Sequence, residues 1–145
     1  MMLVPARVAS GAYMTSRPRV LVADDHHAML DSLVRLLSSE FEIVATVTDG
    51  LSAVTAAARL QPDVLILDIA MPGLNGIAAA ARLKESGSTA KVVFVTNLHD
   101  REFVQESLAL GNVGFVVKDR LVADLLPAIR AVLAGQSFVS PSVAH

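Results

Sequence analysis

The sequence contains no cysteine and few aromatic residues, which make up 4% of the chain. Without cysteine there is neither a disulfide framework nor a thiolate metal site, as is typical of cytoplasmic proteins. No uninterrupted apolar stretch approaches the roughly 20 residues that a membrane-spanning helix requires. The net charge of −2 gives no general attraction to nucleic acid or to acidic membranes. These absences exclude disulfide-stabilised, membrane-spanning and strongly basic classes of protein.

The chain has instead a high apolar fraction of 53%, made mostly of Ala, Val and Leu, and a charged fraction of 18%. At 145 residues it is the size of one ordinary domain and long enough to bury a core. Residues 1–16 do not follow the core pattern and lack the continuous apolar segment of a signal peptide. We therefore expect a disordered N-terminal extension there, within which Met14 is a candidate natural start.

From residue 19 onward, short apolar runs alternate with helical segments. Strands are expected at 19–24, 42–47, 63–68, 91–96 and 113–118. Between them apolar residues recur at spacings of three and four, the period of an amphipathic helix. This alternation predicts a doubly wound α/β fold, with a five-stranded parallel sheet and five helices on its two faces. In such sheets, ligands bind beyond the carboxyl ends of the strands.

Pro127 falls inside the last helical pattern. A proline in a helix interior removes a backbone hydrogen bond and bends the axis. Either this helix begins near Asp124, which leaves Pro127 in its first turn, or it is kinked. The sequence leaves both open.

Ionisable and hydroxyl side chains stand where the predicted strands end. Asp24 and Asp25 end the first strand, Asp68 the third, Thr96 the fourth and Lys118 the fifth. Taken singly, each has a structural explanation, such as a helix N-cap for Asp24 or a turn residue for Asp68. Because the carboxyl ends of parallel strands meet at one edge of a sheet, we expect all five to lie together.

Three acids at one edge need a cation. Two carboxylates about 5 Å apart repel by roughly 3 kcal/mol at an effective dielectric near 20, and such repulsion raises their pKa values. With no His or Cys expected among them, the site is predicted to contain only oxygen ligands, which favours Mg²⁺. A carboxylate beside Mg²⁺, with a Lys and a Thr hydroxyl nearby, is equipped for phosphoryl transfer, in which Asp68 attacks phosphorus.

Four short motifs resemble a known family. These are "VADD" (22–25), "LDIAMPGLNG" (67–76), "VTN" (95–97) and "VVKD" (116–119). Together they resemble the receiver domain of bacterial two-component response regulators over residues 19 to about 135. The resemblance implies a flavodoxin-like fold with strand order 2-1-3-4-5, and a receiver domain that spans residues 17–135.

The resemblance also assigns roles to the strand-end residues. It implies that Asp68 accepts a phosphoryl group from a histidine kinase. Asp25, Asp68 and the backbone carbonyl of Ala70 would hold Mg²⁺, with Asp24 acting mainly through water. Lys118 would contact the phosphoryl group, which classes this protein as a switch that catalyses only its own phosphorylation and dephosphorylation.

Two further residues would form the switch in such a domain. Thr96 would hydrogen-bond the phosphoryl group after transfer and pull the following loop inward. Phe115 stands where the family has an aromatic residue that turns inward when the Thr moves. The structural alternative is that Phe115 is an ordinary core residue.

The closing sequence "AIRAVLAGQSFVSP" is similar to the NarL/FixJ class of response regulators, which carry a C-terminal helix-turn-helix. Residues 136–145 are therefore interpreted as the start of a linker, and DNA would be bound only through an output domain that is missing from this chain. A stand-alone receiver is the alternative. Homodimerisation on phosphorylation is expected, and an interaction module that dimerises without phosphorylation is the third possibility.

Two other chemistries share parts of this pattern. Haloacid-dehalogenase phosphatases also use an Asp after a strand, but they need a second acid where this chain has Ala70, so turnover of phosphate esters is not expected. The adjacent His26 and His27 could suggest a transition-metal site. Neighbours on a helix point about 100° apart, which disfavours joint ligation by the pair.

Overall fold

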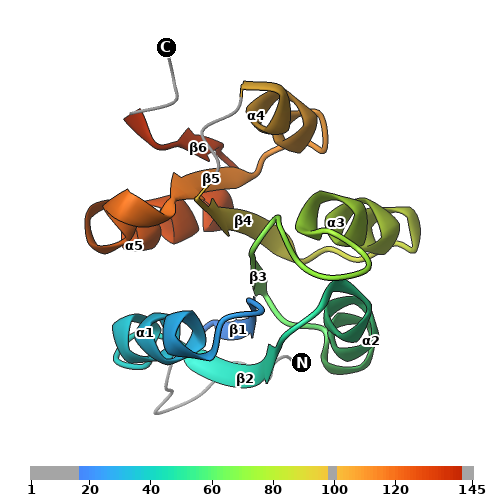
Figure 1. Ribbon diagram of the computed structural model, residues 1–145, viewed down its shortest axis with the longest axis horizontal. Coiled ribbons are helices and arrows are strands. Elements are labelled where there is room, and N and C mark those ends of the chain that lie inside the picture. Colours follow the sequence, from blue (N-terminus) through green and yellow to red (C-terminus); the bar gives the residue numbers. More distant parts are fainter. Residues whose placement is uncertain (1–16, 98–100, 142–145) are drawn as a thin grey trace, which may run out of the picture.

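The computed structural model describes residues 17–97 and 101–141, with the side chain of residue 101 left out (Figure 1). The predicted extension at 1–16 lies outside the described residues. Six strands form one sheet: β1 (Arg19–Ala23), β2 (Glu42–Val47), β3 (Val64–Leu67), β4 (Lys91–Thr96), β5 (Gly114–Val117) and β6 (Phe138–Val139). Five α-helices and one 3-10 helix connect them: α1 (His27–Leu37), α2 (Gly50–Leu60), α3 (Gly76–Glu85), α4 (Arg101–Leu108), η1 (Lys118–Arg120) and α5 (Leu121–Leu133).

The strands lie in the order β2-β1-β3-β4-β5-β6, and every neighbouring pair is parallel. The predicted order 2-1-3-4-5 is confirmed, and so is the α/β doubly wound architecture. The short strand β6 was not predicted, because two residues carry no readable period. It pairs with β5 through Phe138 beside Gly114 and Val139 beside Phe115.

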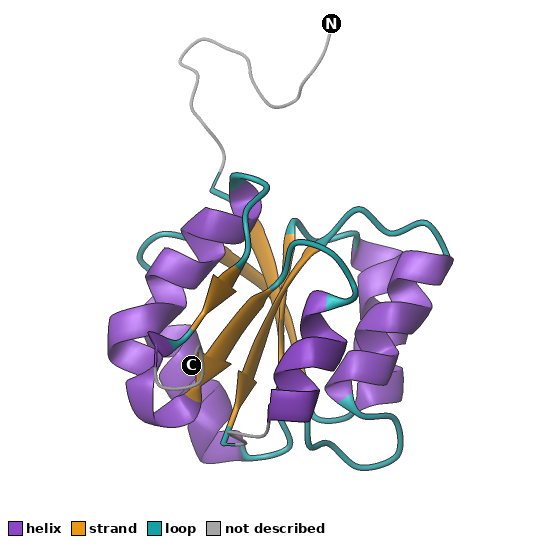
Figure 2. Cartoon of the chain, turned by 90° about the horizontal axis from the view of Figure 1, so that it is seen from above, coloured by secondary structure: helices purple, strands orange, loops and turns teal. Residues whose placement is uncertain are grey.

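The sheet is covered on both faces, with α1 and α5 on one side and α2, α3 and α4 on the other (Figures 1 and 2). Strand side chains alternate between the two layers. In β3, for example, Leu65 and Leu67 pack into the α2–α3–α4 layer, whereas Val64 and Ile66 pack into the α1–α5 layer. All four are at most 1% exposed, so β3 reads as one continuous apolar run, as buried parallel strands do.

Pro127 lies in the interior of α5, which begins at Leu121. The first of the two alternatives, a helix that begins near Asp124, is therefore wrong. The 3-10 turn of η1 continues directly from β5 into α5, and this places the helix start three residues earlier than Asp124. Because Pro127 has no N–H, one helical hydrogen bond is missing there.

Within the described ranges, no helix combines the length and the apolar character that crossing a bilayer requires.

Candidate functional site

Four of the predicted residues meet at the carboxyl edge of the sheet. Asp24 and Asp25 directly follow β1, Asp68 directly follows β3, and Lys118 directly follows β5. The ammonium of Lys118 lies 2.8 Å from Asp24 Oδ2 and 3.4 Å from Asp68 Oδ2. Asp24 is fully buried and Asp68 is 4% exposed. The buried carboxylate at the end of the apolar strand β3 is thus opposed by the buried ammonium of Lys118.

Backbone hydrogen bonds continue past the strand ends and fix the acids in place. The amide of Asp24 donates to the carbonyl of Val47, and the amide of Asp68 donates to the carbonyl of Ala23. One oxygen of Asp24 accepts a hydrogen bond from the amide of His26 at 2.9 Å. Asp24 therefore closes a local turn rather than capping α1, whose N-cap residue is His26.

The loop between β3 and α3 carries Asp68 against the start of α3. The amides of Met71 and Gly76 both donate to the carbonyl of Ile69, which folds the loop back on itself. A Cβ atom at Gly76 would lie 2.1 Å from the carbonyl oxygen of Asp68. Only glycine allows α3 to begin this close to the acid, so residue 76 helps to set the position of Asp68.

We predict that Gly76→Ala pushes the Asp68 backbone away from the site. The added methyl group overlaps a backbone atom that cannot rotate away, so a loss of about 1–3 kcal/mol in the free energy of unfolding is expected, as for other overpacked positions. Urea unfolding measures this loss. Equal stability of the variant and the wild type would show that the loop is not held by this contact.

Burial raises the pKa of Asp68 to about 6, and the charge of Asp24 acts in the same direction. The charge and hydrogen bond of Lys118 lower it, but they do not offset the burial. Near neutral pH the carboxylate is therefore ionised but easily protonated. A nucleophilic carboxylate that is ionised and poorly solvated is well suited to attack phosphorus.

The raised pKa of Asp68 should make the folded chain less stable as the pH rises. Between pH 4 and 6 the folded chain binds more protons than the unfolded chain, so the free energy of unfolding decreases as pH rises. Urea unfolding without divalent cations should show a steeper fall for the wild type than for Asp68→Asn. We expect the change in the free energy of unfolding over this pH range to differ by about 1–2 kcal/mol between the two proteins. A pKa difference of about two is worth about 3 kcal/mol, and solvent at the rim screens part of it.

Asp49 and Asp124, whose pKa values are lowered, contribute the opposite slope. Their contribution is common to both proteins, so the difference between wild type and Asp68→Asn is the useful quantity. Parallel stability curves over this pH range would show that the pKa of Asp68 is not raised in the folded chain.

His26 joins the acidic cluster, which the sequence did not predict. Its Nδ1 lies 3.1 Å from Asp25 Oδ1 and 3.4 Å from Asp24 Oδ1. The expectation that the two histidines point apart assumes that His26 and His27 both lie on a helix. The helix begins at His27, and His26 has an extended backbone that turns its imidazole toward the acids.

The donor set fits a divalent cation. Asp24, Asp25, His26 and Asp68 each offer one ligand atom, and these atoms lie within 4.8 Å of one another. The buried oxygens Asp24 Oδ2 and Asp25 Oδ1 receive no aligned hydrogen bond from the described residues. The basic groups close to them among the described residues are Lys118 Nζ, 2.8 Å from Asp24 Oδ2, and His26 Nδ1, 3.1 Å from Asp25 Oδ1. Carboxylate oxygens are ligands that Mg²⁺ prefers.

Thr96 and Ala70 lie next to residues of this cluster, whereas Phe115 lies in the core. Thr96 ends β4, is 1% exposed and pairs in register with Val117, next to Lys118. Ala70 is exposed in the β3–α3 loop, and its amide lies 3.3 Å from Asp68 Oδ1. Phe115 is fully buried and packs in the α2–α3–α4 layer.

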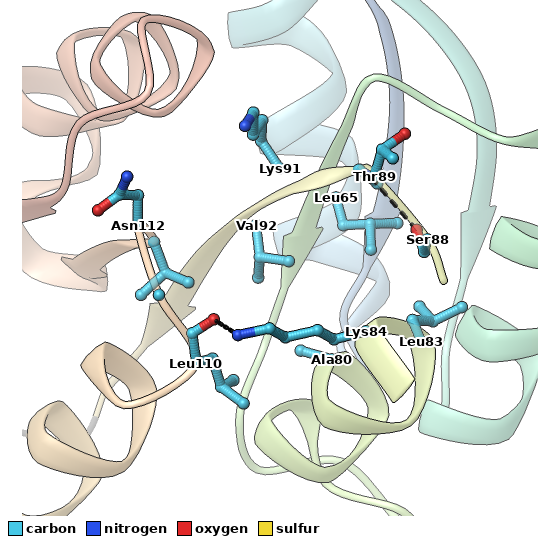
Figure 3. Close-up of a pocket in the computed structure, with 13 residues that line it drawn as sticks. Leu65, Ala80, Leu83, Lys84, Ser88, Thr89, Lys91, Val92, Leu110 and Asn112 are labelled. Carbon is cyan, nitrogen blue, oxygen red and sulfur yellow. Dashed lines mark hydrogen bonds between the residues drawn. The ribbon is translucent and has the colours of Figure 1, made fainter. Parts of the chain in front are cut away.

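A separate pocket of about 370 Å³ opens at the opposite end of the sheet (Figure 3). It lies at the start of β4 and beside the loop that leads into β5. Lys84 reaches across it and donates a hydrogen bond to the carbonyl of Leu110. The described residues that line it include none of the predicted site residues, so this pocket is distinct from the site at the carboxyl edge.

Comparisons with known proteins agree with this geometry. The family model described as "Response regulator receiver domain" matches residues 20–130. Response regulator GacA of Pseudomonas viridiflava is 35% identical over 88% of this chain and 60% of its own length. Transcriptional regulatory protein DegU of Brevibacillus brevis is 31% identical over 88% of this chain and 55% of its own length.

A crystal structure of a two-component response regulator of the LuxR family from Aurantimonas sp. SI85-9A1 has a similar fold, with a TM-score of 0.83. It is 28% identical, and the match covers 89% of this chain and 94% of that one. The fold and the matches define a signalling protein rather than a metabolic enzyme. The chain belongs to the response regulator receiver domain family, and its relatives are of the NarL/FixJ class. It spans less than two thirds of the length of GacA and DegU.

Proposed function

We propose that this chain is a phosphorylation-activated switch that receives a phosphoryl group on Asp68. The observation that supports this most directly is the placement of Asp68: a nearly buried carboxylate with a raised pKa, beside a buried ammonium and two further acids. If Asp68 had only a structural role, a neutral residue in its place would make the folded chain more stable. A phosphoacceptor, in contrast, must be a carboxylate despite this loss of stability.

In the proposed reaction, a carboxylate oxygen of Asp68 attacks the phosphorus of a phosphohistidine on a histidine kinase. The P–N bond breaks, its electron pair returns to the imidazole, and an acyl phosphate forms on Asp68. Lys118 moves little, because it already lies between Asp24 and Asp68, and its charge offsets that of the incoming phosphoryl oxygens. Asp25, Asp68 and the Ala70 carbonyl would hold Mg²⁺, with Asp24 acting through water, and the metal would supply further positive charge to the phosphoryl group.

The proposed output follows from the added charge. An acyl phosphate brings about −1.5 to −2 charge and new acceptor oxygens within reach of the end of β4. The Thr96 hydroxyl would then donate to the phosphoryl group, and Phe115 would follow as the loop after β4 moves. Transcription would be regulated through a helix-turn-helix domain outside this chain, as the name of the relative DegU suggests, with homodimerisation on phosphorylation.

Phosphoryl incorporation from acetyl phosphate tests the proposal. With Mg²⁺, intact-mass measurement should show one phosphoryl group per chain, and EDTA should prevent its addition. Borohydride reduction of the acyl phosphate followed by peptide fragmentation should place the label on residue 68. No incorporation, or a label on Asp24, Asp25 or Asp63, would refute the assignment.

A further inference from the structure

The segment after α5 forms β6, which lies next to β5 at the edge of the sheet (Figure 1). β6 pairs with β5, and the amide of Ser140 donates to the carbonyl of Phe115 at 2.8 Å. Ser140 is fully buried, although it lies at the end of the described chain. A serine buried here must satisfy its hydroxyl within the protein.

The Ser140 hydroxyl is satisfied by a buried acid. Its Oγ donates to Asp124 Oδ2 at 2.8 Å, and Arg120 binds the same carboxylate through Nε at 2.8 Å and Nη2 at 3.2 Å. Asp124 is 4% exposed. Burial acts to raise its pKa, but the hydrogen bonds from Arg120 and Ser140 outweigh this, and the pKa lies below its ordinary value. We call Arg120, Asp124 and Ser140 the C-terminal clip.

The clip also holds the backbone that carries Lys118. The amide of Val117, the residue before Lys118, donates to Ser140 Oγ at 3.1 Å. Arg120 ends the short helix η1 that begins at Lys118. One hydroxyl therefore joins the end of β5, the first turn of α5 and the segment that contains β6. None of the three clip residues belongs to the acid cluster.

We propose that Ser140 is a positioning residue for Lys118, and that the C-terminal clip couples loading of the Asp68 site to the hold on residues 138–140. With the clip closed, the turn at Lys118 is fixed with its ammonium between Asp24 and Asp68. With the clip open, that turn must be ordered again when a phosphoryl group binds, which weakens binding. Because coupling between two sites is reciprocal, loading the site must in turn favour the closed clip.

Through this coupling, phosphorylation of Asp68 would directly affect how residues 138–140 are attached to β5. A phosphorylated site would hold residues 138–140 more firmly against β5. Conversely, a force that pulls these residues away from β5 would make the position of Lys118 less fixed. This inference rests on the proposed function at Asp68. It adds a path to the output that runs through Val117 and Ser140 and does not require the movement of Thr96 or Phe115.

Beryllofluoride with Mg²⁺, as a mimic of the phosphoryl group, tests the coupling in the full chain. Hydrogen exchange should slow both around residues 68–71 and at the amides of residues 138–140 of the wild type. Ser140→Ala should bind beryllofluoride about tenfold more weakly, a coupling of the usual allosteric size. Ser137→Ala is the matched control, because Ser137 is exposed on the same segment and lies outside the clip, and it should bind as the wild type does.

The outcomes separate the two hypotheses. If beryllofluoride slows exchange around residues 68–71 but leaves residues 138–140 unchanged, the coupling is refuted and the proposed function stands. If Ser140→Ala is folded, as circular dichroism will show, and binds beryllofluoride with unchanged affinity, Ser140 is merely structural. Absence of any effect of beryllofluoride would remove both hypotheses. Should Ser140→Ala fail to fold, the exchange measurement on the wild type decides alone.

Discussion

Asp68→Asn is expected to abolish phosphoryl incorporation from acetyl phosphate completely. Asparagine has almost the same shape as aspartate, so the packing of β3 and the contact with Lys118 should survive. An amide oxygen is a far weaker nucleophile than a carboxylate, and it cannot form the acyl phosphate. Intact-mass measurement after incubation with acetyl phosphate and Mg²⁺ gives the readout, with the wild type carrying one phosphoryl group and the variant none.

The same variant should be more stable than the wild type at pH 7 in the absence of divalent cations. The amide side chain in Asp68→Asn places no charge beside Asp24 and requires no desolvation of an ion. A gain of about 1–2 kcal/mol in the free energy of unfolding is therefore expected, as at other sites where function opposes stability. Asp31→Asn, which neutralises an exposed acid on α1, is the control: it should be phosphorylated normally and show little change in stability. Residual phosphorylation of Asp68→Asn at another acid would mean that more than one acid of the cluster can accept the phosphoryl group, and that Asp68 is not specifically required.

Most of the site could be predicted because parallel strands impose it. Once the strands were placed, Asp24, Asp68 and Lys118 had to meet at one edge, whatever the details of the helices. The position of His26 could not be predicted, because it depends on whether α1 begins at residue 26 or 27. A shift of one residue turns the side chain by about 100°, and sequence patterns do not fix helix ends that closely.

The C-terminal clip was missed for a different reason. An acid in a helix pattern is usually solvent-exposed, whereas Asp124 is 4% exposed and accepts hydrogen bonds from Arg120 and from Ser140, the residue after β6. The strand itself is two residues long and pairs with β5, and so short a segment gives no periodic signal in the sequence. One signal was present: Arg120 and Asp124 are four residues apart, the spacing of an ion pair along a helix. Their contact with Ser140 joins segments that only the tertiary structure brings together.

Lys118→Met is expected to destabilise the chain by about 3–5 kcal/mol when no divalent cation is present, the usual effect of removing one partner of a buried ion pair. Methionine fills a similar volume, so the loss is electrostatic. Asp24 and Asp68 would be left buried without the ammonium that lies 2.8 Å and 3.4 Å from them. Because Lys118 is among the groups that lower the pKa of Asp68, that pKa should rise further.

Urea unfolding at pH 7 measures the loss, with Lys84→Met as the control. Lys84 is exposed, so the control should lose far less stability. Two additions should restore part of the loss in Lys118→Met: Mg²⁺, whose charge replaces that of the ammonium, and a second substitution, Asp24→Asn, which removes one of the repelling acids. Strong non-additivity in this double-mutant cycle is expected, since the two residues are in contact. Additive effects would mean that Lys118 stabilises the fold through packing, and that the acids at the sheet edge are neutralised by solvent rather than by the ammonium.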